Sequence, residues 1–354
     1  MVTRAEIGKL AALHAVEPTM LSLYLAVPPA PADLSVLTAR AGELVDAAEA
    51  AAGRAVPERD RNSVREKLAA CAGDWPGPAV AIFACAGSGL LEAVPLPCPL
   101  PERGVLGIRP HIRPLLLARQ RCPAYHVAVV DRRRAWLFSV DGDEADRIGA
   151  VMDSYDHGTV AQLARLVRRG ERGPLVVGGD GDSIRQLLAA VPPDIREAVA
   201  GTITVAGGIT VAGGIAAGPR TLTPARVRDL ASPVITRWAE LRARRVAAEI
   251  LTMPPGGVSA VGLPACLAAV SAGAVQTLVV PGDGLVPGYE CGRCGTLSLD
   301  ADGCCPDWGT AALPVPDVIE EMAGRILEDG GEVWVICDGS SPVAARLSRP
   351  VPQP

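Results

Sequence analysis

The sequence predicts an α/β protein with three domains. The chain has 354 residues, of which 49% are apolar and 21% are charged, so it can bury sizeable cores and differs from a disordered chain. At about 100–200 residues per domain, this length corresponds to two or three domains. Apolar segments of strand length alternate with segments of helix length, and this alternation favours parallel sheets flanked by helices.

The first predicted domain, residues 1–121, begins with a strand that ends at Pro28-Pro29. Two amphipathic helices and a second apolar strand follow. The turn Ala86-Gly87-Ser88-Gly89 then predicts a β-hairpin. The predicted elements are strand 21–27, helices 39–52 and 59–71, and strands 79–85 and 90–96.

The second predicted domain, residues 122–219, opens with another hairpin, whose turn is Asp131-Arg132-Arg133-Arg134. A six-residue repeat, Ile-Thr-Val-Ala-Gly-Gly, fills residues 203–216 together with Ile215-Ala216. Its period is too short for a solenoid, so we interpret it as a duplication that lengthens a linker. The predicted elements are strands 125–130 and 135–140, helix 160–169, strand 175–177, helix 183–190 and strand 202–205.

The third predicted domain, residues 220–354, contains the uncharged stretch 261–280, which has the length of a membrane span. Pro264 and the Ser271-Ala272-Gly273 break instead predict a short helix, a turn and a buried strand. Charged residues near the N-terminus precede any apolar run, so we expect a cytoplasmic protein without a membrane partner. The other predicted elements are helix 224–251, strand 276–280, a cysteine-bearing insert at 289–309, helix 315–328 and strand 332–336.

The cysteine insert predicts a ribbon that resembles a zinc site. Cys291-Gly292-Arg293-Cys294 is a C-x2-C knuckle, and a complete ribbon would present this spacing twice, giving four thiolates for a structural zinc ion. Trp308 stands where the fourth cysteine would fall if Cys305 is the third. A degenerate ribbon without metal is an equal alternative. The candidate ligands are Cys291, Cys294, Cys304 and Cys305, with Asp307 as an alternative ligand.

Other catalytic signatures are missing from the sequence. The four histidines are scattered, and neither a G-x-S-x-G elbow nor a paired carboxylate motif is present. The segment Gly178-Gly179-Asp180-Gly181-Asp182-Ser183 lacks the Gly-Lys-Ser/Thr ending of a P-loop, and its aspartates would repel phosphate. We therefore expect Asp182 or Ser183 to cap a helix there.

The formal net charge of −5 conceals an uneven distribution. Eight arginines fall within residues 103–134 and seven within 220–245, whereas residues 281–354 contain twelve acidic side chains against four arginines. A basic part and an acidic part can orient a protein on a polyanion such as RNA. Solvated helix faces with local ion pairs are the alternative.

The order of these segments resembles the archaeo-eukaryotic class 1 peptide-chain release factors and Pelota, in particular their bacterial relatives, a group that includes the hibernation factor Balon. The resemblance covers nearly the whole chain and rests on the order and spacing of several short strings. They are Leu21–Leu25, Ala81–Phe83 and Arg109–Leu115 in the first domain, Val127–Ala135, Leu175–Gly179 and Val199–Ile203 in the second, and Ala274–Val280, the C-x2-C ribbon, Asp317–Ile319 and Gly330–Val333 in the third.

The resemblance implies an RNase H-like middle domain and a final α/β/α domain like those of kink-turn-binding ribosomal proteins, with a zinc-ribbon insert. It also implies binding at the ribosomal A site, with a translational GTPase such as EF-Tu as a possible partner and no DNA partner. One departure matters for activity. Release factors carry a Gly-Gly-Gln loop, whereas the corresponding stretch here, residues 155–162, contains none. We therefore do not expect this chain to have termination activity.

The resulting hypothesis is a non-catalytic, ribosome-associated factor for hibernation or rescue of stalled ribosomes. Its predicted contacts to rRNA phosphates, which would fix position and not read sequence, are Arg109, Arg113, Arg132, Arg133 and Arg134. Two alternatives remain open. The chain could be a hydrolase of peptidyl-tRNA or RNA that uses a loop near His157, or an interaction scaffold that does not bind ribosomes.

Overall fold

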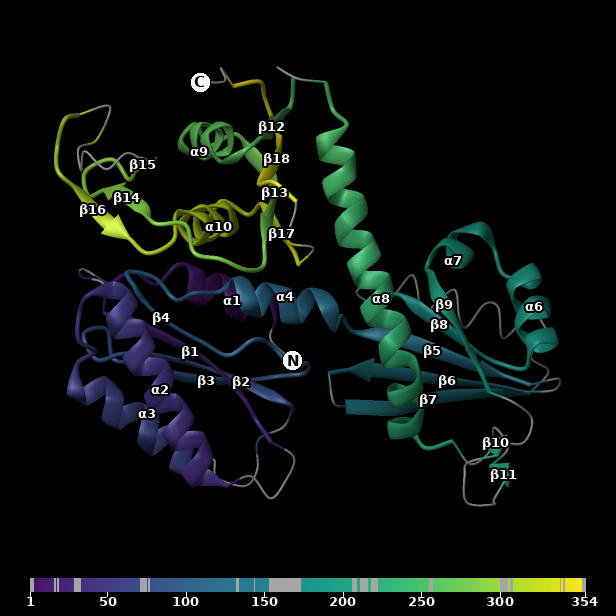
Figure 1. Cartoon of the computed structure of the whole chain (residues 1–354). Coiled ribbons are helices and arrows are strands. Elements are labelled where there is room, and N and C mark those ends of the chain that lie inside the picture. The colour runs from purple at the N-terminus through teal and green to yellow at the C-terminus, as the bar shows by residue number, and fades with distance from the viewer. Residues whose placement is uncertain are drawn as a thin grey trace. The chain divides into compact units, whose positions relative to one another are not determined.

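A computed structural model shows a mixed α/β chain that divides into two compact units (Figure 1). The first unit joins residues 1–120 to residues 243–354, and the second unit holds residues 121–242. The structure describes residues 3–15, 17, 19–28, 33–70, 75, 77–131, 134–142, 144–152, 173–205, 209–210, 216–217, 222–254, 257–299, 305, 308–337, 339 and 341–351.

In the first unit, residues 20–107 form a four-stranded sheet in the order β3-β2-β1-β4 (Figure 1). Every neighbouring pair in this sheet is antiparallel, so the expectation of a parallel sheet is wrong here. A parallel connection between two strands uses one crossover helix, whereas two helices connect β1 to β2. The second helix brings the chain back so that β2 runs antiparallel to β1. The elements are β1 (Met20–Ala26), α2 (Leu34–Ala52), α3 (Glu58–Ala70), β2 (Ala79–Cys85), β3 (Leu90–Leu96) and β4 (Arg103–Gly107).

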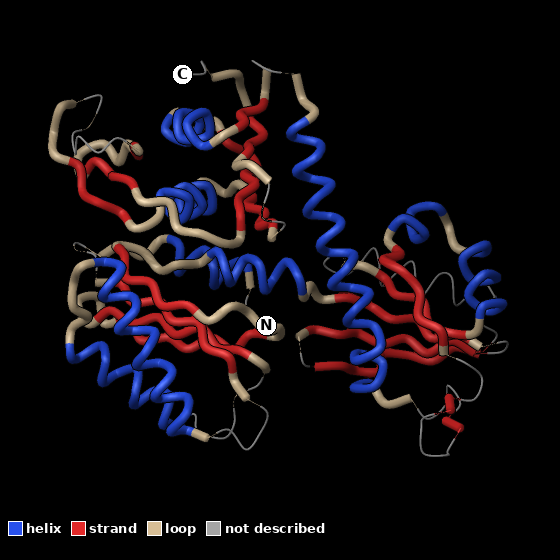
Figure 2. The backbone as a smooth tube through the Cα atoms, in the orientation of Figure 1, coloured by secondary structure: helices blue, strands red, loops and turns tan. Residues whose placement is uncertain are grey.

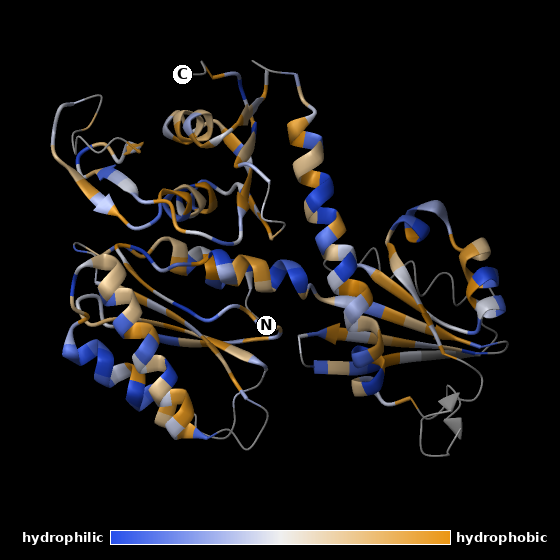
Figure 3. Cartoon of the chain, viewed as in Figure 1, coloured by the Kyte–Doolittle hydropathy of each residue, from blue (hydrophilic) through white to orange (hydrophobic). Residues whose placement is uncertain are grey.

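Alternation of side chains along β1 and β2 gives this sheet two buried faces. Leu21, Leu23 and Leu25 pack with residues of α2 and α3 in one core. Tyr24 and, from β2, Phe83 point to the opposite face, into a second core. In Figure 3 the strands of this sheet are largely orange, that is apolar, whereas α3 is largely blue, that is hydrophilic.

That second core also contains α1 (Arg4–Ala11), α4 (Arg113–Arg121) and the C-terminal part of the first unit. A second sheet has the order β12-β18-β13-β17, in which only β13 and β17 are parallel. A three-stranded ribbon, β15-β14-β16, adjoins α10 through Leu297 and Val318 in the shared core. The elements are β12 (Ser259–Val261), α9 (Leu263–Ser271), β13 (Val275–Pro281), β14 (Gly288–Cys291), β15 (Leu297–Ser298), β16 (Ala312–Val315), α10 (Val318–Glu328), β17 (Glu332–Ile336) and β18 (Ala344–Leu347).

The second unit is a five-stranded sheet in the order β7-β6-β5-β8-β9, covered on both faces (Figure 2). Strands β5, β6 and β7 are antiparallel neighbours, and β8 and β9 run parallel to β5. Val127 and Val129 pack with α8, while Ala128 and Val130 pack with α6 and α7. The elements are β5 (Tyr125–Val130), β6 (Arg134–Asp141), β7 (Glu144–Met152), β8 (Leu175–Gly179), α6 (Gly181–Ala190), α7 (Pro193–Glu197), β9 (Val199–Thr204) and α8 (Pro224–Leu251).

Helix α8 contributes to a core in each unit. Val227, Ala231 and Ile235 belong to the core of the second unit, so residues 220–242 lie in that unit and not with the third predicted domain. Further along the helix, Ala243 and Ala247 pack against β13 and β18 in the first unit. One helix therefore continues from one unit into the other.

Several other predictions can be compared with the structure. The predicted strands 79–85, 90–96 and 332–336 and helix 224–251 are confirmed at both ends. A short antiparallel pair, β10 (Ile209–Thr210) with β11 (Ala216–Ala217), begins within the repeat at 203–216 and ends one residue after it. Helix 160–169 lies outside the described residues. Among the described residues, no helix is both long and apolar enough to span a membrane.

We expect two glycine substitutions to have opposite effects on stability. A Cβ at Gly104 of β4 would lie 2.2 Å from the carbonyl oxygen of Leu44 in α2, so Gly104→Ala should destabilise the first unit by about 3 kcal/mol. Gly42, in the middle of α2, has open space around its Cβ position. Gly42→Ala should therefore stabilise by about 0.5–1 kcal/mol. Urea unfolding measures both, and equal effects would contradict the close packing of α2 on β4.

Candidate functional site

The ribbon of the first unit is built from two turns with the same hydrogen bonds. In the first turn, the N–H of Cys291 donates to the carbonyl of Thr296 at 3.0 Å, and the N–H of Gly295 donates to the carbonyl of Cys291 at 2.7 Å. In the second turn, Cys305 donates to Thr310 at 2.8 Å, and Gly309 donates back to Cys305 at 2.8 Å. Both turns therefore hold a cysteine at their first position.

The two turns bring three cysteine sulfurs together. The Sγ atoms of Cys291, Cys294 and Cys305 all lie within 4.8 Å of one another, and those of Cys294 and Cys305 are 3.5 Å apart. Two thiolates on one tetrahedral zinc ion at about 2.3 Å lie about 3.8 Å apart. The donor set and its spacing thus fit a thiophilic metal such as zinc.

Hydroxyl and backbone groups favour the thiolate form of Cys291. The Oγ1 of Thr310 lies 3.4 Å from its sulfur, and the N–H of Arg293 donates to the sulfur at 3.4 Å. The Thr310 hydroxyl and then the backbone N–H groups of Cys294 and Arg293 lower the pKa of Cys291 to about 6. Thiolates are the metal-binding form of cysteine, so this sulfur is prepared to bind a metal near neutral pH.

The remaining predicted ligands have different outcomes. Cys304 and Asp307 lie outside the described residues. Trp308 is described, and its side chain is 54% exposed. The guanidinium of Arg293 lies over the indole ring, 4.0 Å from its centroid. This stack occupies the second turn at the place where the first turn has Cys294.

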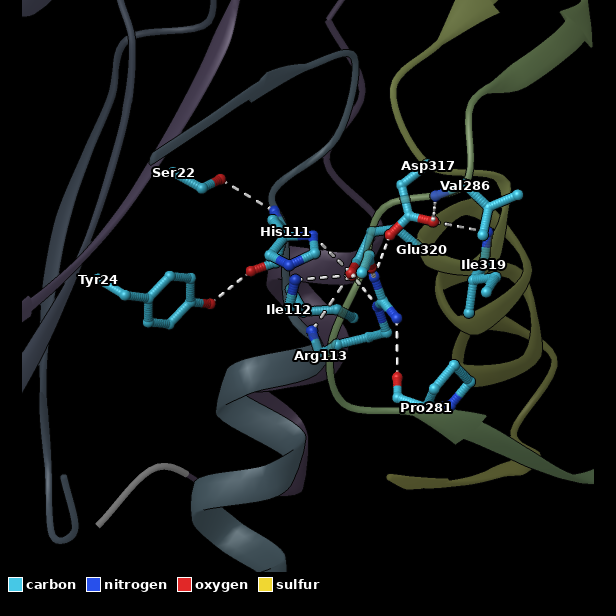
Figure 4. A network of polar contacts seen from close by, with 11 residues as sticks. Ser22, Tyr24, His111, Ile112, Arg113, Pro281, Val286, Asp317, Ile319 and Glu320 are labelled. Atoms are coloured by element: carbon cyan, nitrogen blue, oxygen red, sulfur yellow. Dashed lines mark hydrogen bonds and ion pairs between the residues drawn. The ribbon is translucent and has the colours of Figure 1, made fainter. Parts of the chain in front are cut away.

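A second polar cluster is buried in the first unit around Arg113 (Figure 4). The guanidinium forms ion pairs with Asp317 and with Glu320, whose Oε2 lies 3.3 Å from Nε. Its two terminal nitrogens donate to the carbonyls of Pro281 and Gly284, both at 2.8 Å. The side chain of Arg113 is fully buried, so these contacts replace its water shell.

His111 and backbone groups complete the surroundings of Glu320. The Nδ1 of His111 lies 2.8 Å from Oε2 of Glu320, and the N–H of Ile112 donates to Oε1 at 2.6 Å. Burial opposes ionisation of Glu320, but His111, Arg113 and the Ile112 N–H outweigh it, so the pKa of Glu320 lies below its usual range. For Asp317, burial prevails over Arg113 and raises the pKa.

Arg109 makes a neighbouring set of contacts. Its Nε lies 2.9 Å from Oε2 of the buried Glu321, and Nη1 forms an ion pair with Glu328 and donates to the carbonyl of Ala11 at 2.9 Å. Burial and then the nearby carboxylate of Glu290 raise the pKa of Glu321 to about 8, although Arg109 opposes this shift. Glu321 therefore titrates within the neutral range.

These contacts revise the predicted RNA-binding set. The side chain of Arg113 is 0% exposed and that of Arg109 is 8% exposed, so carboxylates occupy both guanidinium groups and RNA phosphates cannot reach them. Arg132 and Arg133 lie outside the described residues. Arg134 is half-buried, and its N–H donates to Asp131 at 2.8 Å to close the β5–β6 turn.

The segment that follows β8 has a structural role, as expected. Asp180 caps α6, since its carboxylate accepts from the N–H groups of Asp182 and Ser183 at 3.0 and 2.9 Å. Capping is thus confirmed, but Asp180 performs it and not Asp182 or Ser183. His157 and residues 155–162 lie outside the described residues.

Helix α8 carries exposed arginines that the predicted contact set omitted. Arg237, Arg244 and Arg245 are exposed, and none makes an ion pair with another described residue. Leu241, 53% exposed, lies between them in the sequence. Residues three, four and seven apart share a helix face, so the seven arginines within residues 220–245 were the signal that could have identified this group.

Comparisons with known proteins give structural neighbours only. No protein-family model and no curated protein matches the sequence. Pelota from Archaeoglobus fulgidus is 13% identical, over 77% of this chain and 80% of that chain, with a TM-score of 0.40. Dom34 of S. cerevisiae, a translation termination-like factor that interacts with Hbs1, is 11% identical over 77% and 80%, with a TM-score of 0.39. The archaeal translation termination factor aRF1 is 15% identical over 98% of both chains, with a TM-score of 0.24. Because these TM-scores are below 0.5, the functional interpretation rests on this chain's own residues.

We expect Arg113→Met to destabilise the first unit by about 3–5 kcal/mol, because it leaves Asp317 and Glu320 buried without their guanidinium partner. Urea unfolding of the full chain measures the change. Arg65→Met is the matched control, since Arg65 is 56% exposed, lies 3.9 Å from Glu58 and donates to the side chain of Asn62 at 3.3 Å. The unfolding midpoint of this variant should hardly change. A small effect of Arg113→Met would contradict the role of the cluster in stability.

The raised pKa of Glu321 predicts a specific pH dependence. In the folded state Glu321 keeps its proton up to about pH 8, whereas in the unfolded state it loses the proton near its usual 4.5. The folded state therefore binds more protons between these values, and its free energy of unfolding falls as pH rises through this window.

Glu321→Gln should remove this part of the decline, so its stability relative to the wild type should increase from pH 5 to pH 8. Urea unfolding at several pH values measures the difference. Glu328→Gln serves as control, because Glu328 contacts the same Arg109 but is 37% exposed. If the free energies of unfolding of Glu321→Gln and the wild type change equally with pH, the raised pKa of Glu321 is contradicted.

Proposed function

We propose that this chain is a release-factor-like translation factor that binds the ribosomal A site during hibernation or rescue of stalled ribosomes. The proposal starts from the sequence strings that resemble class 1 release factors and Pelota. The observation that carries it is the group of exposed arginines on α8, Arg237, Arg244 and Arg245, none with an ion-pair partner among the described residues. Unpaired arginines on a helix surface suit the phosphates of rRNA.

The basic character of α8 contrasts with the rest of the chain. The whole chain carries a net charge of −5, so a general attraction to polyanions is not expected from net charge. A local group of guanidinium groups can still bind phosphates within a Debye length of about 8–10 Å. We propose that Arg132, Arg133 and Arg134 of the β5–β6 turn add to this contact, and we leave out the buried Arg109 and Arg113.

The proposed role is binding, without hydrolysis of peptidyl-tRNA by the chain itself. This part rests on the sequence, in which residues 155–162 contain no Gly-Gly-Gln. In this proposal a translational GTPase delivers the factor, the middle domain is RNase H-like, and the protein acts in the cytoplasm. A metal in the ribbon would hold the two turns together through thiolates.

We expect the double substitution Arg244→Glu and Arg245→Glu to weaken ribosome binding by at least about tenfold, because reversing two phosphate contacts replaces attraction by repulsion. Sedimentation of extracts from growing and starved cells through sucrose gradients, at low and high salt, measures the bound fraction. The wild-type protein should migrate with ribosomes at low salt and less so at high salt.

Arg65→Glu is the matched control, because Arg65 is an exposed arginine on α3, outside the proposed contact. Its bound fraction should equal that of the wild type. Wild-type protein that never migrates with ribosomes, even in starved cells, would refute the proposed function. Equal binding of the wild type and the double variant would refute only the contact on α8.

A further inference from the structure

We propose that the ribbon binds a metal ion through three thiolates, Cys291, Cys294 and Cys305, and that Trp308 takes the place of a fourth ligand. Neither Cys304 nor Asp307 binds the ion, and an exchangeable solvent molecule fills the fourth coordination position. This inference is independent of the proposed function. It rests on the internal symmetry of the ribbon and on the contact between Arg293 and Trp308.

The first step is the correspondence between the two turns. Each contains a cysteine whose N–H donates to a threonine carbonyl five residues later, and a glycine whose N–H donates back to that cysteine. The two glycines, Gly295 and Gly309, have positive φ values of 73° and 62°, a conformation that favours glycine. The hydrogen bonds of Cys291, Gly295 and Thr296 are therefore repeated in the same register by Cys305, Gly309 and Thr310.

The register fixes which residue occupies each ligand position. A metal knuckle supplies its ligands from the first and fourth positions, which are Cys291 and Cys294 in the first turn. In the second turn the same positions are Cys305 and Trp308. Cys304 precedes the second turn, so it has no ligand counterpart in the first.

Asp307 corresponds to Arg293, which stands at the third position of its turn. The side chain of Arg293 lies over the ring of Trp308, and only its backbone N–H contacts a cysteine sulfur, that of Cys291 at 3.4 Å. The third position therefore directs its side chain to the neighbouring turn and not to the sulfurs. By this correspondence Asp307 is not a ligand.

Trp308 cannot replace the missing thiolate, because the indole nitrogen is only a hydrogen-bond donor. The ring is 54% exposed, and Cys294 is also exposed. The fourth coordination position therefore faces the surface, whereas Cys291 and Cys305 are buried. Three protein ligands with one position for solvent is the arrangement that allows ligand exchange at a metal.

Cobalt(II) bound to the reduced full-length chain tests the proposal, since thiolates give it charge-transfer bands whose intensity follows their number. The wild type should bind one Co²⁺ per chain, and added imidazole should shift its visible spectrum by replacing the solvent ligand. Trp308→Cys should increase the charge-transfer intensity by about one third and tighten Co²⁺ binding at least about tenfold. Imidazole should then leave its spectrum unchanged.

Cys304→Ser and Asp307→Asn are the matched variants, and both should retain the wild-type spectrum, affinity and imidazole response. Cys305→Ser should lose one third of the charge-transfer intensity or all binding. A loss of intensity in Cys304→Ser, an altered spectrum in Asp307→Asn, or a wild-type spectrum that ignores imidazole would each overturn the proposal. So would reduced wild-type protein that binds no Co²⁺, and these outcomes do not require Trp308→Cys to fold.

Discussion

The buried guanidinium of Arg113 is the constraint on which the first unit depends. It joins the first residue of α4 to Asp317, the N-cap of α10, across 204 residues of sequence. Burying these charges has a high desolvation cost, which is offset only when each donor finds a partner. The carbonyls of Pro281 and Gly284 and the carboxylate of Glu320 supply those partners. In the sequence, the second unit, residues 121–242, is inserted between the two segments of the first unit that this cluster connects.

This role of Arg113 changes how the charge distribution is understood. The arginine-rich segment 103–134 and the acidic residues of α10 looked like two oppositely charged surfaces. In the structure, Arg109 forms an ion pair with Glu328, and Arg113 forms ion pairs with Asp317 and Glu320, all within one unit. Part of the charge asymmetry is thus accounted for by ion pairs within the first unit. Among the described residues, exposed arginines remain on α8.

The elements that could be predicted from sequence are those with a strong local pattern. The apolar strand 79–85 and its hairpin were predictable because the turn residues and the side-chain alternation agree. Strand direction was not, since it depends on the pairing of α2 with α3 between β1 and β2. The Arg113 cluster could not be predicted either, because no local sequence pattern relates His111 to Glu320. The cysteine spacing did identify three sulfurs that meet, and it placed Trp308 at the fourth position if Cys305 is the third. The hydrogen bonds of both turns were needed to establish that Cys305 corresponds to Cys291.

The ribbon can keep its fold without a fourth thiolate. Its turns are closed by backbone hydrogen bonds, and Leu297 packs in the main core of the first unit. The Nη2 of Arg325 in α10 lies 2.8 Å from Glu290 in β14, and a Cβ at Gly288 would lie 2.3 Å from Val318. A ribbon held this closely against α10 does not need four metal bonds to keep its shape. A metal held by three thiolates is therefore compatible with a stable ribbon.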